Sequence, residues 1–160
     1  MNNTPSTCNS CAALAQDNLT LFETTHWKVD LAPNQAYLGR SYVNLRRHAG
    51  HLGQLTPPEW AELGRVITRF EEAVTNTFGA TCFNWTALMN NAYKSAAPNP
   101  HVHLHVWPRY QTAPNVLGKV FEDPNFAHHY DKTATHDVEP ELLNEISLVL
   151  RKNMGSMGGL

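Results

Sequence analysis

The segment HVHLHVWPR, residues 101–109, alternates imidazole side chains with apolar ones. Because successive side chains of a strand point to opposite faces of a sheet, the pattern predicts a β-strand from His101 to Trp107. Its apolar residues would face a core. Its histidines would share the other face, in a row with steps of roughly 6.6 Å, two residues at about 3.3 Å each. Pro108 has no N–H group and is expected to end the strand pairing.

A row of histidines on a rigid strand has two chemical uses. Imidazole has an unperturbed pKa of about 6.5 and is largely neutral at pH 7, so it can attack phosphorus. Its neighbours could donate hydrogen bonds to phosphate oxygens or protonate a leaving group. Two histidines at positions i and i+2 of a strand equally suit zinc, copper or iron. The spacing alone leaves both uses open.

The rest of the chain predicts one α+β domain with an antiparallel sheet, one long helix and a C-terminal helix. The long helix begins at a capping box, Thr56-Pro57-Pro58-Glu59, and ends at Gly79. Large apolar residues recur along it and would form one buried face: Trp60, Leu63, Ile67, Phe70, Val74 and Phe78. Further elements are expected at 26–31, 40–47 and 81–89 (strands), 11–21 (a short helix) and about 142–150 (the terminal helix).

The whole chain, residues 1–160, is expected to form this one domain. Its motif-bearing core spans about 8–110, a loop and helix follow at 111–152, and a flexible tail is expected at 153–160. The stretch 110–136 contains two prolines and shows little periodicity. A loop of this length in a compact domain is usually functional or disordered, so we predict a lid over a substrate.

Composition and charge exclude several functions. The net charge is −2 with neutral histidines, so the chain lacks the broad basic surface that duplex nucleic acid requires. No apolar run approaches the roughly 18 residues of a membrane span. The polar start, MNNT, carries no signal-peptide pattern, and a cytoplasmic location is expected. Three cysteines, an odd and sparse count, argue against a disulfide framework.

The histidine row and its surroundings resemble the histidine triad (HIT) family. The motif His-x-His-x-His with apolar residues between, followed by Pro-Arg, is highly specific. The similarity extends to the RRH segment at 46–48, to the capped helix, and to Asn90, which lies eleven residues before the triad. The pair Cys8-x-x-Cys11 resembles the zinc-bearing, diadenosine tetraphosphate hydrolase-like branch. In all, the similarity covers roughly residues 8–110.

The resemblance implies a role for each matching residue. The middle histidine, His103, would be the nucleophile, oriented by a backbone carbonyl that accepts from its other ring nitrogen. His105 would contact phosphate oxygens, and His101 would support the site. Asn90 would bind phosphate or a sugar hydroxyl, and Asp30 stands near the position of a ribose contact.

The sequence departs from the family just before the triad. Many members carry Gly-Gln-Ser or Gly-Gln-Thr there, and those side chains hydrogen-bond the leaving group. Here residues 96–100 read AAPNP, so Asn99 is the candidate to compensate. Arg109 could bind phosphate or anchor the loop that follows, and the anchor is the favoured interpretation. Trp107 is a candidate to line the pocket, whereas Trp27 and Trp85 are expected in the core rather than stacked on a nucleobase.

The cysteine pair predicts a structural zinc site, because Cys8 and Cys11 would supply two of the four ligands that such a site needs. The resemblance implies that His48 and His101 complete the set, with His51 as an alternative to His48. The other interpretation is that the cysteines are two ordinary thiols near a loose terminus.

The favoured function is hydrolysis of dinucleoside polyphosphates or nucleoside phosphoramidates through a covalent nucleotidyl-histidine, carried out by a homodimer, as the resemblance implies. A nucleotidyltransferase of the same mechanism is the first alternative, and a nucleotide-binding regulatory module without turnover is another. The rival of a different class is a cupin-like metal-binding protein. A cupin would add a glutamate shortly after its His-x-His, whereas no acidic residue follows here until Glu122.

Overall fold

The computed structural model describes residues 8–16 and 19–155 of the chain. Five strands form one antiparallel sheet in the order β1-β2-β3-β5-β4: β1 (Thr20–Glu23), β2 (Trp27–Leu31), β3 (Ser41–Leu45), β4 (Cys82–Thr86) and β5 (His103–Arg109). The helices are α1 (Asn9–Leu14), α2 (Pro57–Phe78) and α3 (Pro140–Gly155). Two 3-10 turns and a small hairpin complete the described elements: η1 (Leu52–Gln54), η2 (Asn90–Lys94), β6 (Asn115–Val116) and β7 (Lys119–Val120).

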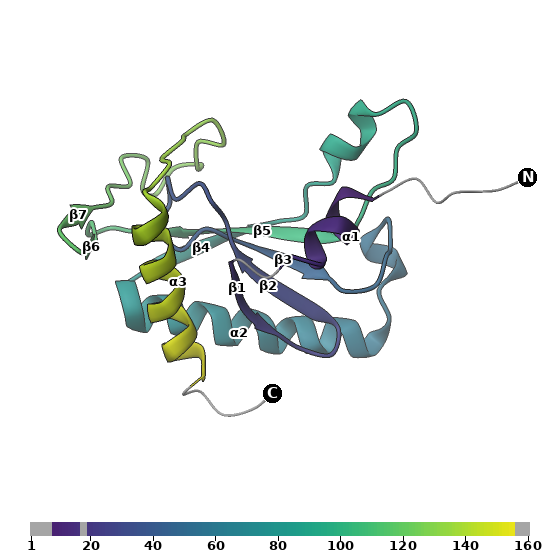
Figure 1. Ribbon diagram of the computed structural model, residues 1–160, viewed down its shortest axis with the longest axis horizontal. Coiled ribbons are helices and arrows are strands. Elements are labelled where there is room, and N and C mark those ends of the chain that lie inside the picture. Colours follow the sequence, from purple (N-terminus) through teal and green to yellow (C-terminus); the bar gives the residue numbers. More distant parts are fainter. Residues whose placement is uncertain (1–7, 17–18, 156–160) are drawn as a thin grey trace, which may run out of the picture.

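The α+β architecture with an antiparallel sheet is therefore confirmed. Helices α2 and α3 cover one face of the sheet, whereas α1 and η2 lie on the opposite side (Figure 1). Side chains alternate between these faces along each strand. On β5, Leu104 and Val106 are buried beneath α2 and α3, and His103 and His105 face the side of α1.

Helix α2 has the ends that the sequence predicts. The Thr56 N–H donates to the Glu59 carboxylate at 2.7 Å, which closes the capping box, and Gly79 ends the helix with a φ of 75°. The prediction for Trp60 is wrong, because this side chain is 47% exposed. The buried face of this part of α2 is instead formed by Glu59 and Glu62, whose oxygen atoms accept from Trp27 Nε1 and the His26 N–H, and Trp60 lies beside that face.

The N-terminal helix is also shorter than predicted. It ends at Leu14 rather than continuing to Leu21, and the chain becomes strand β1 from Thr20. Leu21 is 5% exposed in the core, and Thr20 pairs with Asp30 of β2. The hydrogen bonds of a strand partner therefore outweigh the local helical pattern here.

Strand β5 begins and ends later than the sequence predicts. It starts at His103, so His101 precedes the strand, and it continues through Pro108 to Arg109. The carbonyl of Arg109 accepts from Thr81 on the β4 side, so the nitrogen of Pro108 points to the β3 side. The pairing with β3 ends at Ser41 and Val106. The missing N–H of Pro108 therefore falls where no neighbouring strand needs it.

The C-terminal helix continues beyond the predicted limit, because α3 includes residues 153–155. The remaining tail, 156–160, lies outside the described residues. No helix in the described ranges is long and apolar enough to cross a membrane.

Candidate active site and metal centre

A cavity of about 880 Å³ lies over the histidine-bearing face of the sheet. It is bounded by α1, by the segment around η2, and by side chains of β2, β3 and β5. The sheet contributes Asp30 from β2, Tyr42 and Asn44 from β3, and His103 and His105 from β5. A concave site of this size is suited to a ligand as large as a nucleotide.

The tautomer of His103 follows from its hydrogen bonds. Its Nδ1 lies 2.8 Å from the backbone carbonyl oxygen of His101, and a carbonyl can only accept. Nδ1 therefore carries the proton of the neutral ring, and Nε2 carries a lone pair that faces the cavity. This is the arrangement that a nucleophilic imidazole requires.

His105 is held beside this lone pair. Its Nε2 lies 3.2 Å from Nε2 of His103, so in the neutral pair His105 is the donor. The ring is stacked on Trp107, at 5.2 Å between centroids, and meets the edge of Tyr42 at 5.1 Å. Burial, with smaller contributions from the charges of His103 and Arg40, lowers the pKa of His105 to about 4. At neutral pH it is therefore an uncharged hydrogen-bond donor.

His101 does not continue the row. It precedes the strand, is 2% exposed, and its Nε2–H donates to the carbonyl of Leu45 at 2.7 Å. Its Nδ1 consequently presents a lone pair, which lies 3.5 Å from Sγ of Cys8 and 3.3 Å from Sγ of Cys11. Burial is the main cause that lowers the pKa of His101, so its ring favours the neutral form.

Four donors converge at this point. The ligand atoms of Cys8, Cys11, His48 and His101 all lie within 4.8 Å of one another. Tetrahedral zinc, with Zn–S of about 2.3 Å and Zn–N of about 2.05 Å, would separate a sulfur and a nitrogen by about 3.6 Å. Three of the four sulfur–nitrogen separations are 3.5, 3.6 and 3.3 Å, and the fourth is at most 4.8 Å. The donor set therefore fits a tetrahedral metal ion, and His48 rather than His51 belongs to it.

Asp30 lies on the cavity wall with its carboxylate held on both oxygens. The Thr20 hydroxyl donates to Oδ1 at 2.9 Å, and the Asn44 amide donates to Oδ2 at 3.1 Å. Burial raises its pKa, and these hydrogen bonds together with the charge of Lys28 act in the opposite direction. Each oxygen retains a lone pair, so the group can accept from neighbouring hydroxyls of a ligand.

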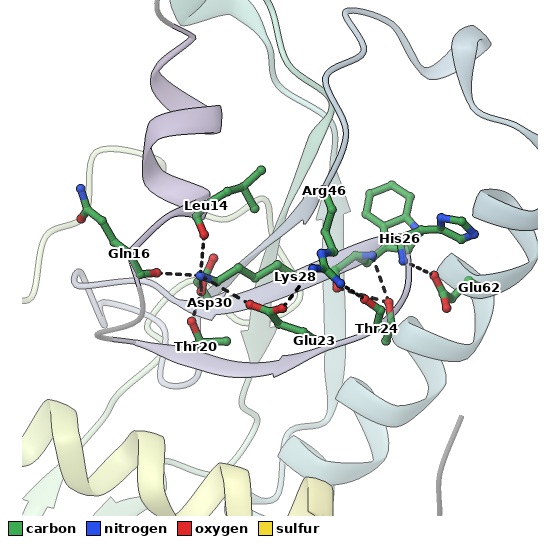
Figure 2. A network of polar contacts seen from close by, with 11 residues as sticks. Leu14, Gln16, Thr20, Glu23, Thr24, His26, Lys28, Asp30, Arg46 and Glu62 are labelled. Carbon is green, nitrogen blue, oxygen red and sulfur yellow. Dashed lines mark hydrogen bonds and ion pairs between the residues drawn. The ribbon is translucent and has the colours of Figure 1, made fainter.

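Lys28 supports Asp30 from below, and sequence reasoning missed it. Its ammonium donates to the carbonyls of Leu14 and Gln16 at 3.0 and 2.6 Å, near the end of α1 (Figure 2). It also lies 3.7 Å from Glu23 and 3.9 Å from Asp30. The buried ammonium of Lys28 thus connects the end of α1, which forms a wall of the cavity, with the Asp30 carboxylate on another wall.

The two asparagines proposed from the sequence are placed differently. Asn99 lines the cavity, as do Ser95 and Ala97 of the same loop. Asn90 is exposed and does not line it, whereas Asn91 does. The 3-10 turn η2 begins at Asn90 and turns its side chain away, a conformation that the spacing to the triad cannot reveal.

Arg109 is an anchor and is not available to a ligand. Its Nε and Nη2 donate to the two oxygens of Asp123 at 2.7 and 2.9 Å. The other donors reach Asn84 Oδ1 and the carbonyls of Asn125 and His128, so all five N–H groups are used. In this arrangement no donor of Arg109 is left for a phosphate, and the contacts support the loop interpretation.

This anchoring also changes the interpretation of the 110–136 segment. Tyr130 stacks on Trp107 at 4.1 Å between centroids, and Trp107 is 2% exposed. The segment therefore packs on the same face of the sheet as the histidines and covers its Trp107–Arg109 end. Trp107 supports His105 from behind and does not line the cavity. Trp27 and Trp85 lie in and against the core, as predicted.

Comparisons with solved structures identify this architecture. A hypothetical histidine triad nucleotide-binding protein from Sulfolobus tokodaii has a TM-score of 0.69 at 13% identity, covering 94% of this chain and 93% of that chain. A zinc-bound histidine triad family protein from Mycobacterium smegmatis has a TM-score of 0.62 at 21% identity, with 94% of each chain covered. Diadenosine triphosphate hydrolase from Plasmodium falciparum has a TM-score of 0.60 at 13% identity, covering 89% of this chain and 80% of that chain.

No protein-family model and no curated protein sequence matches the chain. The structural matches have low sequence identity and are therefore evidence for the fold alone. They show that the chain has the histidine triad fold, as the resemblance of its triad motif implied.

Proposed function

We propose that the protein is a nucleotide hydrolase that acts on dinucleoside polyphosphates or related nucleoside phosphoramidates through a covalent nucleotidyl-histidine. The observation that carries the proposal is the His103 ring, whose Nδ1 donates to a backbone carbonyl while Nε2 faces a nucleotide-sized cavity. The shared fold with a diadenosine triphosphate hydrolase supports the choice of substrate class.

In the first step, Nε2 of His103 attacks the α-phosphorus of the bound substrate. The new N–P bond forms as the P–O bond to the leaving polyphosphate breaks, and the electron pair departs with the leaving oxygen. The imidazole becomes cationic, and the carbonyl of His101 stabilises it through the Nδ1–H. The Nε2–H of His105 turns from His103 to a phosphate oxygen as charge develops there.

In the second step, water attacks the same phosphorus. The P–N bond breaks, its electron pair returns to Nε2 of His103, and the proton lost by water passes to solvent. The products are a nucleoside monophosphate and the leaving group. Asp30 would hold the ribose hydroxyls through the lone pairs that Thr20 and Asn44 leave available.

We further propose that the ion suited to the Cys8, Cys11, His48 and His101 donors is a structural zinc. Thiolates and imidazoles are the usual ligands of such sites, and the His101 ring is oriented by its bond to the carbonyl of Leu45. Zinc bound here would stabilise the attachment of α1 to the sheet. The shared fold with a zinc-bound protein supports this assignment.

The decisive experiment is rapid quench of the wild type with diadenosine tetraphosphate, followed by mass spectrometry at neutral or alkaline pH. A nucleotidyl adduct is expected on the peptide that contains His103. His103→Ala should lose activity by several orders of magnitude, up to about 10⁶, with its fold intact. The exposed His51 provides a matched control, because His51→Ala should retain both activity and adduct.

Retention of most activity by His103→Ala would contradict the mechanism. Product analysis separates the alternatives: transfer of the nucleotide to a phosphorylated acceptor but not to water would indicate a nucleotidyltransferase. Tight nucleotide binding without any product would indicate a regulatory module.

The homodimer also remains a proposal, supported by the family resemblance and by the open edge of β4, which pairs only with β5 in the described sheet. Light scattering should give twice the mass of one chain, and a mass of one chain would contradict it. The cytoplasmic location stays a prediction.

A further inference from the structure

Arg40 lies on the histidine-bearing face of the sheet, directly before β3. Ser41 is fully buried toward the core and pairs with Val106, and Tyr42 pairs with His105 on the opposite face. Strand alternation therefore places Arg40 on the face of Tyr42, opposite Trp107 and one row beyond His105. Its guanidinium carbon lies 5.3 Å from the centroid of the Trp107 ring, which fixes the side chain in a cation–π contact.

Among the residues that the structure describes, the charge of Arg40 has no anionic partner. Within the described ranges its guanidinium makes no hydrogen bond or ion pair, and its Nε is buried. Arg109, one row further along β5, uses all its donors on Asp123 and its neighbours. Partly buried guanidinium groups are normally paired, so Arg40 is an unused anion-binding group.

Other unpartnered atoms gather at the same place. The buried side-chain nitrogen and oxygen atoms without a partner, counted over the described residues, are Arg40 Nε, Thr86 Oγ1, His105 Nδ1, Trp107 Nε1 and Ser147 Oγ. All but Ser147 lie in the two neighbouring rows of His105 and Trp107, since Thr86 pairs with His105 across β4 and β5. Buried atoms of this kind call for an explanation, and contact with a ligand, a reacting group or ordered water would supply one.

The part of the cavity lining that the structure describes supplies no lysine or arginine side chain. Lys28, the cation beneath Asp30, is committed to two carbonyls and two carboxylates. A ligand with several phosphates therefore requires a cation from outside these lining residues. Arg40 lies one row beyond His105, and its only described side-chain contact is the one with the Trp107 ring.

We propose that Arg40 binds the leaving-group phosphates of the substrate, those beyond the α-phosphorus that His103 attacks. This inference rests on the proposed function and narrows its substrate class. A polyphosphate that runs from His103 past His105 along β5 reaches Arg40, whereas the amine of a phosphoramidate leaves no charge for it to bind. Arg40 is thus a specificity-determining residue that favours polyphosphate substrates over phosphoramidates.

The test compares two substrates in Arg40→Gln. For diadenosine tetraphosphate, kcat/KM should fall roughly ten- to hundredfold, the range for a lost hydrogen bond to a charged group. For adenosine 5′-phosphoramidate the loss should be at least tenfold smaller. Arg40→Lys, which keeps the charge, should recover part of the tetraphosphate activity. The exposed Arg65 is the control, because Arg65→Gln removes an equal charge far from the site and should alter neither value.

Equal losses on the two substrates, or no loss on either, would overturn the inference. Melting curves of Arg40→Gln and Arg40→Lys show whether a loss reflects folding, and a folded Arg40→Lys with no advantage over the glutamine variant would also overturn it.

A binding measurement separates this inference from the proposed function. Calorimetric titration of His103→Ala with AMP and with ATP, without metal, should show tighter binding of ATP by roughly tenfold or more. Adding Arg40→Gln should remove that difference. If His103→Ala alone binds AMP and ATP equally tightly, or if the double variant still binds ATP more tightly, Arg40 does not bind these phosphates. If the wild type hydrolyses neither substrate, the proposed hydrolase is wrong while this titration still decides the role of Arg40.

Discussion

The low pKa of His105 predicts a measurable dependence of stability on pH. The ring is partly buried between Tyr42 and Trp107, and the groups whose charge acts on it are His103 and Arg40. Together these lower its pKa to about 4, with burial as the main cause. In the unfolded chain the same ring has a pKa of about 6.5. Folding therefore makes protonation of His105 harder.

The sign of the effect follows from proton uptake. Above pH 6.5 the ring is neutral in both states, and it contributes no pH dependence. Between pH 6.5 and about 4 the unfolded chain takes up a proton that the folded protein resists, so the free energy of unfolding falls as the pH falls. Below pH 4 both states are protonated and the loss is complete.

The two pKa values set the magnitude. A difference of about 2.5 units corresponds to a full loss of about 3.4 kcal/mol, and at pH 5 the loss is about 2 kcal/mol. The ring borders the cavity and is partly screened by water, which reduces the expected loss at pH 5 to about 1–2 kcal/mol.

The assay is urea denaturation at pH 7.5 and pH 5.0 for the wild type and His105→Gln. The fall in pH also acts on the other titratable groups of the chain, but both proteins share that loss. The wild type should lose about 1–2 kcal/mol more than His105→Gln between the two pH values. His129→Gln, which removes an exposed histidine, should behave as the wild type.

Equal losses for the wild type and His105→Gln would refute the reasoning. It would mean that His105 titrates near its ordinary pKa in the folded protein, and that the stack with Trp107 does not keep water from the ring. A direct check is the imidazole proton shift of His105, which should not change between pH 7 and pH 5.5.

Three further changes test other parts of the structure. Cys8→Ser should remove about one zinc per chain by elemental analysis and lower the melting temperature more than turnover per folded molecule; full metal content would contradict the assigned ligand. Lys28→Met should lower the free energy of unfolding, measured by urea denaturation, by about 1–3 kcal/mol; this is less than for a fully buried pair because the Glu23 side chain is 39% exposed. The same variant should raise KM more than it lowers kcat. Lys152→Met is the exposed control, and equal effects of the two substitutions would contradict the role of Lys28. Asp123→Asn should speed hydrogen exchange across 110–136, since both partners of the Arg109 ion pair are 2% exposed, and unchanged exchange would contradict the anchor.

The period-two pattern of residues 101–109 was enough to predict that His103 and His105 share a face. It could not predict that His101 leaves the row. That departure depends on where the pairing with β3 stops, at Asn44 and His103, and on two thiols about 90 residues earlier in the chain. Strand alternation is a local property, whereas the end of a strand and the contacts of its flanking residues are set by tertiary structure.

The same distinction explains why the sequence pattern does not reveal the surroundings of single residues. Lys28 has the pattern of an exposed strand lysine, and only the position of α1 above it makes it a buried charge. Asn90 has the spacing of the family to the triad, but the turn η2 decides which asparagine faces the cavity. Arg109, in contrast, could be interpreted correctly, because an arginine before a long loop already suggests an anchor.

The histidine-bearing face of the sheet contains two kinds of region, which differ in whether their buried polar groups have hydrogen-bond or ion-pair partners. Where Lys28 meets Asp30 and Glu23, and where Arg109 meets Asp123, buried charges are neutralised within the chain, and these contacts stabilise the fold. Between them lie Arg40 Nε and His105 Nδ1, which are buried and have no partner in the described structure. Leaving such atoms unsatisfied costs stability, about 1–3 kcal/mol each, which a bound anion could recover. The unsatisfied atoms that lower the stability of the sheet therefore lie next to the nucleophile His103. This pattern is expected of a site that is arranged for its ligand rather than for stability.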